Sequence, residues 1–343
     1  MLSAKQTGLV IVGLASAAGV VLALTLGRPN PGDPQNPPAA EPAIRIVEPS
    51  SLAASPHVLF RHSASDAHYN HMSLAPVAEP NSRRGVTSLQ CERVSFAAGR
   101  GICLKADRGV FTKYEAVLFD DRFQPLRSMK LDGSPSRTRV SPDGRIGAIT
   151  VFVTAQGHGY ATLGSFLTRT ILLDMASGDV IGDLEQFSTW RDGARFTAKD
   201  FNFWGVTFAR DSNTFYASLQ SANNTYLVRG DLPLRRLTVV HENVECPAIS
   251  PNNRLIAYKK RVGGALRPWR FHVLELATMT ERPIAAETRS IDDQIEWYDD
   301  AHVLYATTRS SQSAIFDVWM APIDGDTPAT RFLNMADSPV VAR

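Results

Sequence analysis

The chain has 343 residues, of which 44% are hydrophobic and 20% are charged, and its formal net charge is +2 at pH 7. These values are typical of a folded domain that faces water, and a charge so close to zero argues against nucleic acid as a partner. The length alone would allow two domains, so internal patterns must decide the organisation.

The N-terminus contains the only strongly apolar stretch. Lys5 lies in residues 1–7, and the 19 residues from Gly8 to Leu26 contain no charge. Such a stretch is long enough to span a bilayer and also falls within the range of a long signal peptide. We predict a cytoplasmic segment at 1–7 and a transmembrane anchor or signal peptide at 8–27, with the rest exported because the positive charge precedes the apolar run. The anchor gives a single-pass protein of the cell membrane; cleavage would give a secreted or periplasmic one.

Residues 28–55 follow as a predicted Pro-rich, disordered linker. The segment 29–40 contains five prolines and cannot build a core. The folded domain is therefore expected at 56–343.

Within this region the chain repeats a hydrophobic strand, a Ser-Pro-Asp/Asn-Gly/Asn turn and a second hydrophobic strand. The pattern occurs at 139–149 and 248–258. With three looser copies, equivalent positions are separated by 46, 68, 41 and 48 residues, at Val94, Val140, Phe208, Ile249 and Trp297. Three of these intervals fit a four-stranded propeller blade of about 40–50 residues. The long interval predicts an insertion, which we place around 156–160 and 192–196.

Both ends of the domain carry unmatched strands. Residues 334–341 look like a first strand with nothing after it, whereas 56–62 and 71–77 look like later strands with nothing before them. Joining them gives a sixth blade and removes open sheet edges. We therefore predict an all-β, six-bladed β-propeller whose sixth blade is closed by N- and C-terminal strands.

The three cysteines allow two interpretations. Cys91 and Cys103 lie on neighbouring predicted strands, but if Phe96 faces Gly101, then Cys103 faces Val94, so a disulfide would need a bulge. Export would permit the bond. The alternative is a pair of buried thiols, and Cys246 is expected in the core in either case.

Motifs for metal binding or catalysis are lacking. His68 and His71, with His57 and His62 upstream, have no cysteine or acidic partner at a metal-ligand spacing, and residues three apart on a strand point to opposite faces. The sequence contains no Gly-x-Ser-x-Gly, His-Glu-x-x-His or phosphate-loop motif. We predict no metal, no cofactor and no catalytic residue.

Charged and polar residues recur near the predicted inner strands, which line the central channel of a propeller. They are expected to form a mixed acidic and basic ring at the channel mouth, able to hold a cation, a polar ligand or a peptide. Alternatively, they satisfy strand ends and stabilise contacts between blades. The candidate ligand-binding residues are Arg93, Arg137, Arg139, Asp200, Asn202, Glu245, Asp292, Asp293 and Glu296.

The Ser-Pro-Asp-Gly-Arg sequence at 141–145, its relative at 250–254 and the divided sixth blade resemble the propeller of TolB and its exported relatives. The segments 99–104, 202–208 and 292–297 are similar to an actinobacterial branch of TolB-like translocation proteins. The resemblance covers about residues 56–343 and does not extend to the N-terminal α/β domain of TolB. It implies a non-enzymatic binding module of the cell envelope.

The leading hypothesis is a membrane-tethered, exocytoplasmic propeller that binds a cell-envelope protein or ligand at its channel face. A second is a carbohydrate-active lyase or hydrolase that uses carboxylates such as Asp200, Asp292 and Asp293 as metal ligands or acid and base groups. A third is a purely structural envelope protein. Convergence of these carboxylates on one pocket would favour chemistry, whereas carboxylates spread around the ring and bound to backbone amides would favour binding.

Overall fold

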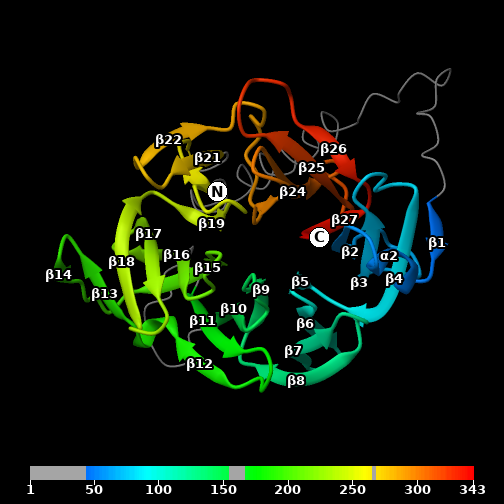
Figure 1. Cartoon of the computed structure of the whole chain (residues 1–343), viewed down its shortest axis with the longest axis horizontal. Helices are drawn as coiled ribbons and strands as arrows, with labels where there is room; N and C mark the ends of the chain where they lie inside the picture. The colour runs from blue at the N-terminus through cyan, green and yellow to red at the C-terminus, as the bar shows by residue number, and fades with distance from the viewer. Residues whose placement is uncertain (1–43, 154–166, 265–267) are drawn as a thin grey trace, which may run out of the picture. The chain divides into compact units, whose positions relative to one another are not determined.

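The computed structural model describes residues 44–153, 167–264 and 268–343. In this part of the chain six β-sheets are arranged around a central axis (Figure 1), which confirms the predicted six-bladed propeller. We call the axial strand of each sheet its inner strand.

Five blades are built from strands that are consecutive in the chain and follow one another from the axis outward. Blade 1 contains β5 (Arg93–Ala97), β6 (Arg100–Arg108), β7 (Thr112–Asp120) and β8 (Pro125–Leu131). Blade 2 contains β9 (Ser134–Val140), β10 (Ile146–Val153), β11 (Leu167–Asp174) and β12 (Val180–Asp183). Blade 3 contains β15 (Asn202–Phe208), β16 (Thr214–Ser221), β17 (Asn224–Asp231) and β18 (Arg236–Glu242). Blade 4 contains β19 (Glu245–Ile249), β20 (Leu255–Arg261), β21 (Trp269–Glu275) and β22 (Thr280–Pro283). Blade 5 contains β23 (Glu296–Trp297), β24 (His302–Thr308), β25 (Phe316–Pro322) and β26 (Thr330–Leu333).

Blade 6 combines strands from opposite ends of the domain, as predicted. Its inner strand β27 (Ala336–Ala342) pairs antiparallel with β2 (His57–His62). Two further strands, β3 (His71–Pro76) and β4 (Arg83–Gln90), continue the sheet outward. Closure between β27 and β2 turns the row of blades into a ring.

The propeller begins earlier in the chain than the predicted boundary at residue 56. Strand β1 (Arg45–Val47) pairs parallel with β4, and the short helix α2 (Ser50–Ala53) places Leu52 in the blade core at 3% exposure. The end of the predicted 28–55 linker is therefore ordered, because its apolar side chains cover the sheet. The predicted anchor at 8–27 and the linker before residue 44 lie outside the described residues. Within the described ranges no helix has the length and apolar character needed to cross a membrane.

The repeated turn has a side-chain explanation. In blade 2, Ser141 Oγ donates to Asp143 Oδ1 at 2.7 Å and accepts from the Ile146 amide at 2.9 Å. Ser250 and Asn252 make the equivalent bonds in blade 4. The following position is left-handed, with φ of +72° at Gly144 and +62° at Asn253, which glycine and asparagine tolerate best. The turn chemistry therefore fixes where the inner strands of blades 2 and 4 end.

The predicted insertion at 192–196 is an added hairpin. Strands β13 (Ser188–Arg191) and β14 (Ala194–Arg195) extend blade 3 beyond β18, with β13 parallel to β18. The 3₁₀ turn η1 (Leu184–Gln186) leads into it. The other predicted location, 156–160, lies outside the described residues.

Hydrophobic clusters fill the spaces between neighbouring blades. One joins blades 2 and 3 through Leu172, Phe203 and Phe215, each at most 1% exposed. Because the buried faces of the inner strands pack against the neighbouring blades, each blade depends on its two neighbours for its core.

Cys91 and Cys103 form a disulfide, with their Cα atoms 5.3 Å apart. The β5–β6 register is the predicted one, with Val94 opposite Cys103 and Phe96 opposite Gly101. No bulge is needed, because Cys91 precedes β5 and is not held by its register. Cys246 is a buried free cysteine, as expected.

Replacing both Cys91 and Cys103 by serine is expected to lower the free energy of unfolding by about 3 kcal/mol, the usual value for a short closed loop. Denaturant titration of the variant and of the wild type measures this loss. Thiol counting in denaturant is an independent check, since it should find one reactive thiol per chain before reduction and three after it. Three thiols without reductant would contradict the bond.

Candidate functional site

The ring has two faces that differ in their loops. We call the face on which the inner strands begin the upper face and the face on which they end the lower face. Because neighbouring strands in a blade are antiparallel, the second strand ends on the upper face and the Ser-Pro turns lie on the lower one.

Two of the predicted arginines meet in the channel. Arg93 Nε donates to the Ser136 carbonyl oxygen at 3.0 Å, and Arg137 Nη1 donates to the same oxygen at 2.9 Å. Arg93 begins the inner strand of blade 1, and Arg137 lies on that of blade 2. The contact between neighbouring blades therefore brings two guanidinium groups to one acceptor.

Each of three predicted acidic residues has its own ion-pair or hydrogen-bond partner. Asp292 pairs with Lys259, and Asp293 Oδ2 accepts from the Ala306 amide at 2.9 Å. Asp200 is exposed and accepts from Ser221 Oγ at 2.8 Å and from the Ala222 amide at 2.7 Å. Asp292 and Asp293 are consecutive residues before β23 and both lie near Arg137, whereas Asp200 lies apart, before β15 of blade 3.

Two further predicted residues hold blades together or line a side pocket. Asn202 Oδ1 accepts from the Thr168 amide at 2.9 Å and from its hydroxyl at 2.6 Å, which joins blade 3 to blade 2. Glu245 is buried at 6% exposure, with Arg261 Nη2 at 3.9 Å. Glu245 and Arg261 line a pocket of about 510 Å³ whose other walls are mostly amide side chains of blade 3 and of the segment that follows it.

Arg139 and Glu296 do not belong to the upper mouth. Arg139 Nη1 donates to Glu296, and both line a cavity of about 310 Å³ at the ends of the inner strands, beside Pro142 of the Ser-Pro turn. Both residues also line the small space beside Arg93 and Asp293, so the pair lies between that space and the lower cavity.

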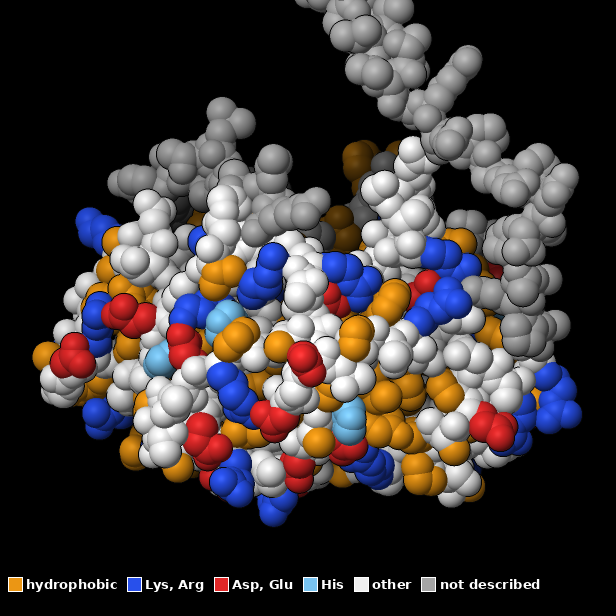
Figure 2. Space-filling view, turned by 90° about the horizontal axis from the view of Figure 1, so that it is seen from above, with side chains coloured by type: hydrophobic (Ala, Val, Ile, Leu, Met, Phe, Trp, Pro, Cys, Tyr) orange, Lys and Arg blue, Asp and Glu red, His pale blue; other side chains and the backbone are white. Residues whose placement is uncertain are grey.

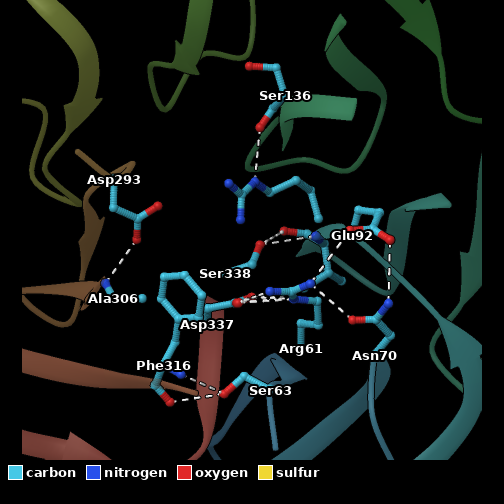
Figure 3. Close-up of polar contacts among 12 residues, drawn as sticks. Arg61, Ser63, Asn70, Glu92, Ser136, Asp293, Ala306, Phe316, Asp337 and Ser338 are labelled. Carbon is cyan, nitrogen blue, oxygen red and sulfur yellow. Dashed lines mark hydrogen bonds and ion pairs between the residues drawn. The ribbon is translucent and has the colours of Figure 1, made fainter. Parts of the chain in front are cut away.

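The sequence missed a second set of charged residues. Arg61 Nε donates to Asp337 Oδ1 at 2.7 Å, and Arg61 Nη1 donates to Asn70 at 3.0 Å and lies 3.5 Å from Glu92 (Figure 3). Lys259, the partner of Asp292, was also missed. These residues sit within strands of ordinary composition, and only the register of β2 against β27 places Arg61 opposite Asp337.

A small space lies between the inner strands of blades 1, 2 and 6 and the segment that leads into β23. Its volume is about 20 Å³, and its lining includes Arg93, Asp293 and Ser338. That is room for about one water molecule. Groups larger than water therefore do not fit in this space.

Charges in the mouth shift one another's proton affinity. Burial, and then the neighbouring Arg137, lower the pKa of Arg93. Burial would raise the pKa of Asp292, but Lys259 and Arg137 outweigh it and hold that pKa below its usual range. Burial raises the pKa of Glu245, with Lys259 opposing. Asp292 is therefore held as a carboxylate, and Glu245 is the acid of this group that is more easily protonated.

Exposed apolar side chains occur on loops of the upper face. Val110 and Phe111, at the tip between β6 and β7, are 97% and 82% exposed. Tyr69, between β2 and β3, and Val262, after β20, are also exposed. Elsewhere charges of both signs are interspersed, as on the face drawn in Figure 2. The most exposed apolar tip thus lies on the face that carries the channel mouth with the two arginines.

The histidines have local partners. His62 Nε2 lies 3.0 Å from Asp66 Oδ2, and His71 Nδ1 lies 2.7 Å from the Thr87 carbonyl oxygen. Within residues 44–153, 167–264 and 268–343 no three metal-ligating side chains are gathered in a way that could hold an ion.

Comparisons by sequence give no relative, since neither a family profile nor a curated protein matches the chain. Among solved structures, TolB from Acinetobacter baumannii is similar at 14% identity and a TM-score of 0.54, over 84% of this chain and 66% of that chain. This chain thus spans just under two thirds of that TolB. A chain of the nidogen/laminin complex is similar at 11% identity and a TM-score of 0.56, over 84% of this chain and 99% of that chain. At such identities the likeness to TolB is one of fold: the chain has a TolB-like β-propeller.

Proposed function

We propose that the protein is an exported, non-enzymatic binding module that recognises a cell-envelope partner with the upper face of its propeller. The observation that carries this proposal is how the carboxylates are held. Asp292 and Asp293 are adjacent but are bound by Lys259 and by the Ala306 amide, and Asp200 lies apart in blade 3, so the three do not form an acid and base pair around one substrate. A rigid ring with variable loops is suited to recognition.

Exposed apolar loops support the upper face as the contact surface. Binding faces combine a few exposed aromatic or aliphatic anchors with a polar surround. Val110 and Phe111 supply the anchors, and the charged channel mouth supplies the polar groups. Leu234, which is 68% exposed, lies on the lower face between β17 and β18 and provides a comparison.

Export is part of the proposal. A disulfide persists in oxidising compartments, so the Cys91–Cys103 bond supports a location outside the cytoplasm. We propose that residues 8–27 tether the propeller to the membrane, with a cleaved signal peptide as the alternative. Membrane fractionation of the full chain distinguishes the two by its apparent mass and its release into the soluble fraction.

The test is crosslinking capture from native envelope with the full chain. A Val110→Ser, Phe111→Ser variant is compared with Leu234→Ser, which removes an exposed apolar side chain from the lower face. We expect the wild type and Leu234→Ser to capture the same protein and the double variant to capture at least about tenfold less, since loss of an anchor costs about 2 kcal/mol or more. Equal capture by all three proteins, or capture by none, would contradict the proposal.

A further inference from the structure

We infer that Arg93 and Arg137 form a binding site for an oxyanion, a carboxylate or phosphate group, that the partner inserts into the upper mouth of the channel. The inference rests on the proposed function and specifies the chemistry of the group that is recognised.

The first support is the shared acceptor. Both guanidinium groups donate to the Ser136 carbonyl oxygen, so two cations are held side by side by one neutral oxygen. Arg137 Nε is buried and has no hydrogen-bond partner in the described part of the chain. A guanidinium carries five N–H donors, and each arginine uses one of them in this contact. The remaining donors match the oxygens of a carboxylate or phosphate, which bind guanidinium groups with two parallel hydrogen bonds.

The second support is the charge balance. The nearby acids already have partners: Asp337 is paired with Arg61, and Asp292 with Lys259. Asp293, which accepts from a backbone amide, is the remaining carboxylate near the two arginines. The Cys246 thiol also lies near Arg137. Arg137 lowers the pKa of Arg93, so the two cations repel each other, and an incoming anion would offset this repulsion, whereas Asp293 and Asp292 already stabilise the Arg137 charge and raise its pKa.

The third support is the shape of the channel. Arg93 and Arg137 are both partly exposed, and Arg93 also lines a space of about 20 Å³ between the inner strands. A terminal carboxylate would therefore contact the exposed parts of the two guanidinium groups from the mouth, without entering this space. The apolar loops of the upper face would contact the rest of the partner. The loops and the two arginines would thus bind the same partner.

The binding test uses the full chain and two probes, inorganic phosphate and acetate. Calorimetric titration at constant ionic strength compares the wild type with Arg93→Gln, Arg137→Gln and the control Arg122→Gln, which removes an exposed charge on the turn between β7 and β8. We expect the wild type and the control to bind at least one probe, and each channel variant to bind it about tenfold or more weakly, since hydrogen bonds to charged groups contribute about 1.5–3 kcal/mol. The preferred probe indicates whether the natural group is a carboxylate or a phosphate. Absence of binding by the wild type, or unchanged binding by both channel variants, would overturn the inference.

Stability provides a check that the variants fold. We expect both Arg93→Gln and Arg137→Gln to unfold in one cooperative transition, with Arg137→Gln melting below the wild type because it removes a charge that Asp293 and Asp292 stabilise.

Partner capture separates this inference from the proposed function. If the Arg93→Gln, Arg137→Gln protein loses both the anion and the partner, the partner supplies the oxyanion. If it loses the anion but captures the partner as the wild type does, the inference about the partner fails and the proposed function stands. If the wild type captures no partner yet binds the anion, the proposed function fails, and the site serves a free anion.

Discussion

Replacing Asp337 by alanine is expected to lower the free energy of unfolding by about 3–5 kcal/mol, the range found when one partner of a buried ion pair is removed. Asp337 is 1% exposed and lies on β27, directly opposite Arg61 on β2. The variant leaves the Arg61 guanidinium without its main partner, in the strand pair that closes the ring. Denaturant titration measures the loss.

A matched control isolates the effect of burial. Asp324→Ala breaks an ion pair with Arg282 whose side chains are 71% and 40% exposed, and such pairs contribute about 0–1 kcal/mol. A double variant, Arg61→Met with Asp337→Leu, should lose less than Asp337→Ala, because it leaves no unpaired charge. If Asp337→Ala cost no more than Asp324→Ala, the ring would not depend on this pair for closure.

Replacing Arg84 by methionine is expected to cause the second large loss of stability and to change how stability depends on pH. Arg84 is 1% exposed; it donates to His62 Nδ1 at 2.7 Å and to the Asn334 carbonyl oxygen at 2.8 Å, and it lies over the Phe60 ring. Arg84→Met leaves two buried acceptors unpaired, each at a cost of about 1–3 kcal/mol. We expect a loss of roughly 3 kcal/mol at pH 7.5, measured by denaturant titration.

The pH dependence follows from the state of His62. Its Nε2 faces Asp66 Oδ2 and its Nδ1 accepts from Arg84, which describes a neutral ring. Burial and then Arg84 lower the pKa of His62 below 6.5 in the folded state. The unfolded chain therefore binds more protons below pH 6.5, so stability falls as the pH drops from 6.5 through the folded pKa. The pKa values of His57 and His272 are lowered by burial as well and act in the same direction.

The variant separates these contributions. Without the Arg84 charge, His62 is protonated more easily in the folded state, so Arg84→Met should lose less stability than the wild type between pH 7.5 and pH 5. The titration of His57 and His272 retains part of the dependence of stability on pH in both proteins. Parallel pH profiles for the two proteins would show that Arg84 does not act on His62.

The sequence alone predicted the features that short-range chemistry encodes. The serine, aspartate and glycine of the repeated turn specify hydrogen bonds within six residues, so the turn at 141–146 and its relative at 250–255 could be recognised as strand connections. Regular spacing of these turns predicted the number of blades, and unmatched strands at the ends predicted the closure of the sixth.

Boundaries and bonds at the edges of elements were less predictable. The ordered segment at 45–53 has no repeat partner, and its place in blade 6 depends on the parallel pairing of β1 with β4. From the sequence, Cys91 and Cys103 could form either a disulfide or a pair of buried thiols, because the predicted register places Cys103 opposite Val94. Cys91 reaches Cys103 because it lies outside the ladder, a position that sequence patterns locate only to within a few residues.

The chemistry of the channel was decided by tertiary structure. Arg93 and Arg137 share one carbonyl oxygen because two neighbouring blades meet there, and Arg61 joins Asp337 across 276 residues of sequence. Arg139 and Glu296, which the sequence assigned to the same mouth, lie between the small space beside Arg93 and the lower cavity. The sequence determines the repeated turns because their hydrogen bonds connect residues that are close in the chain. The candidate site depends instead on how six sheets close around an axis. That closure brings together residues that no local sequence pattern relates.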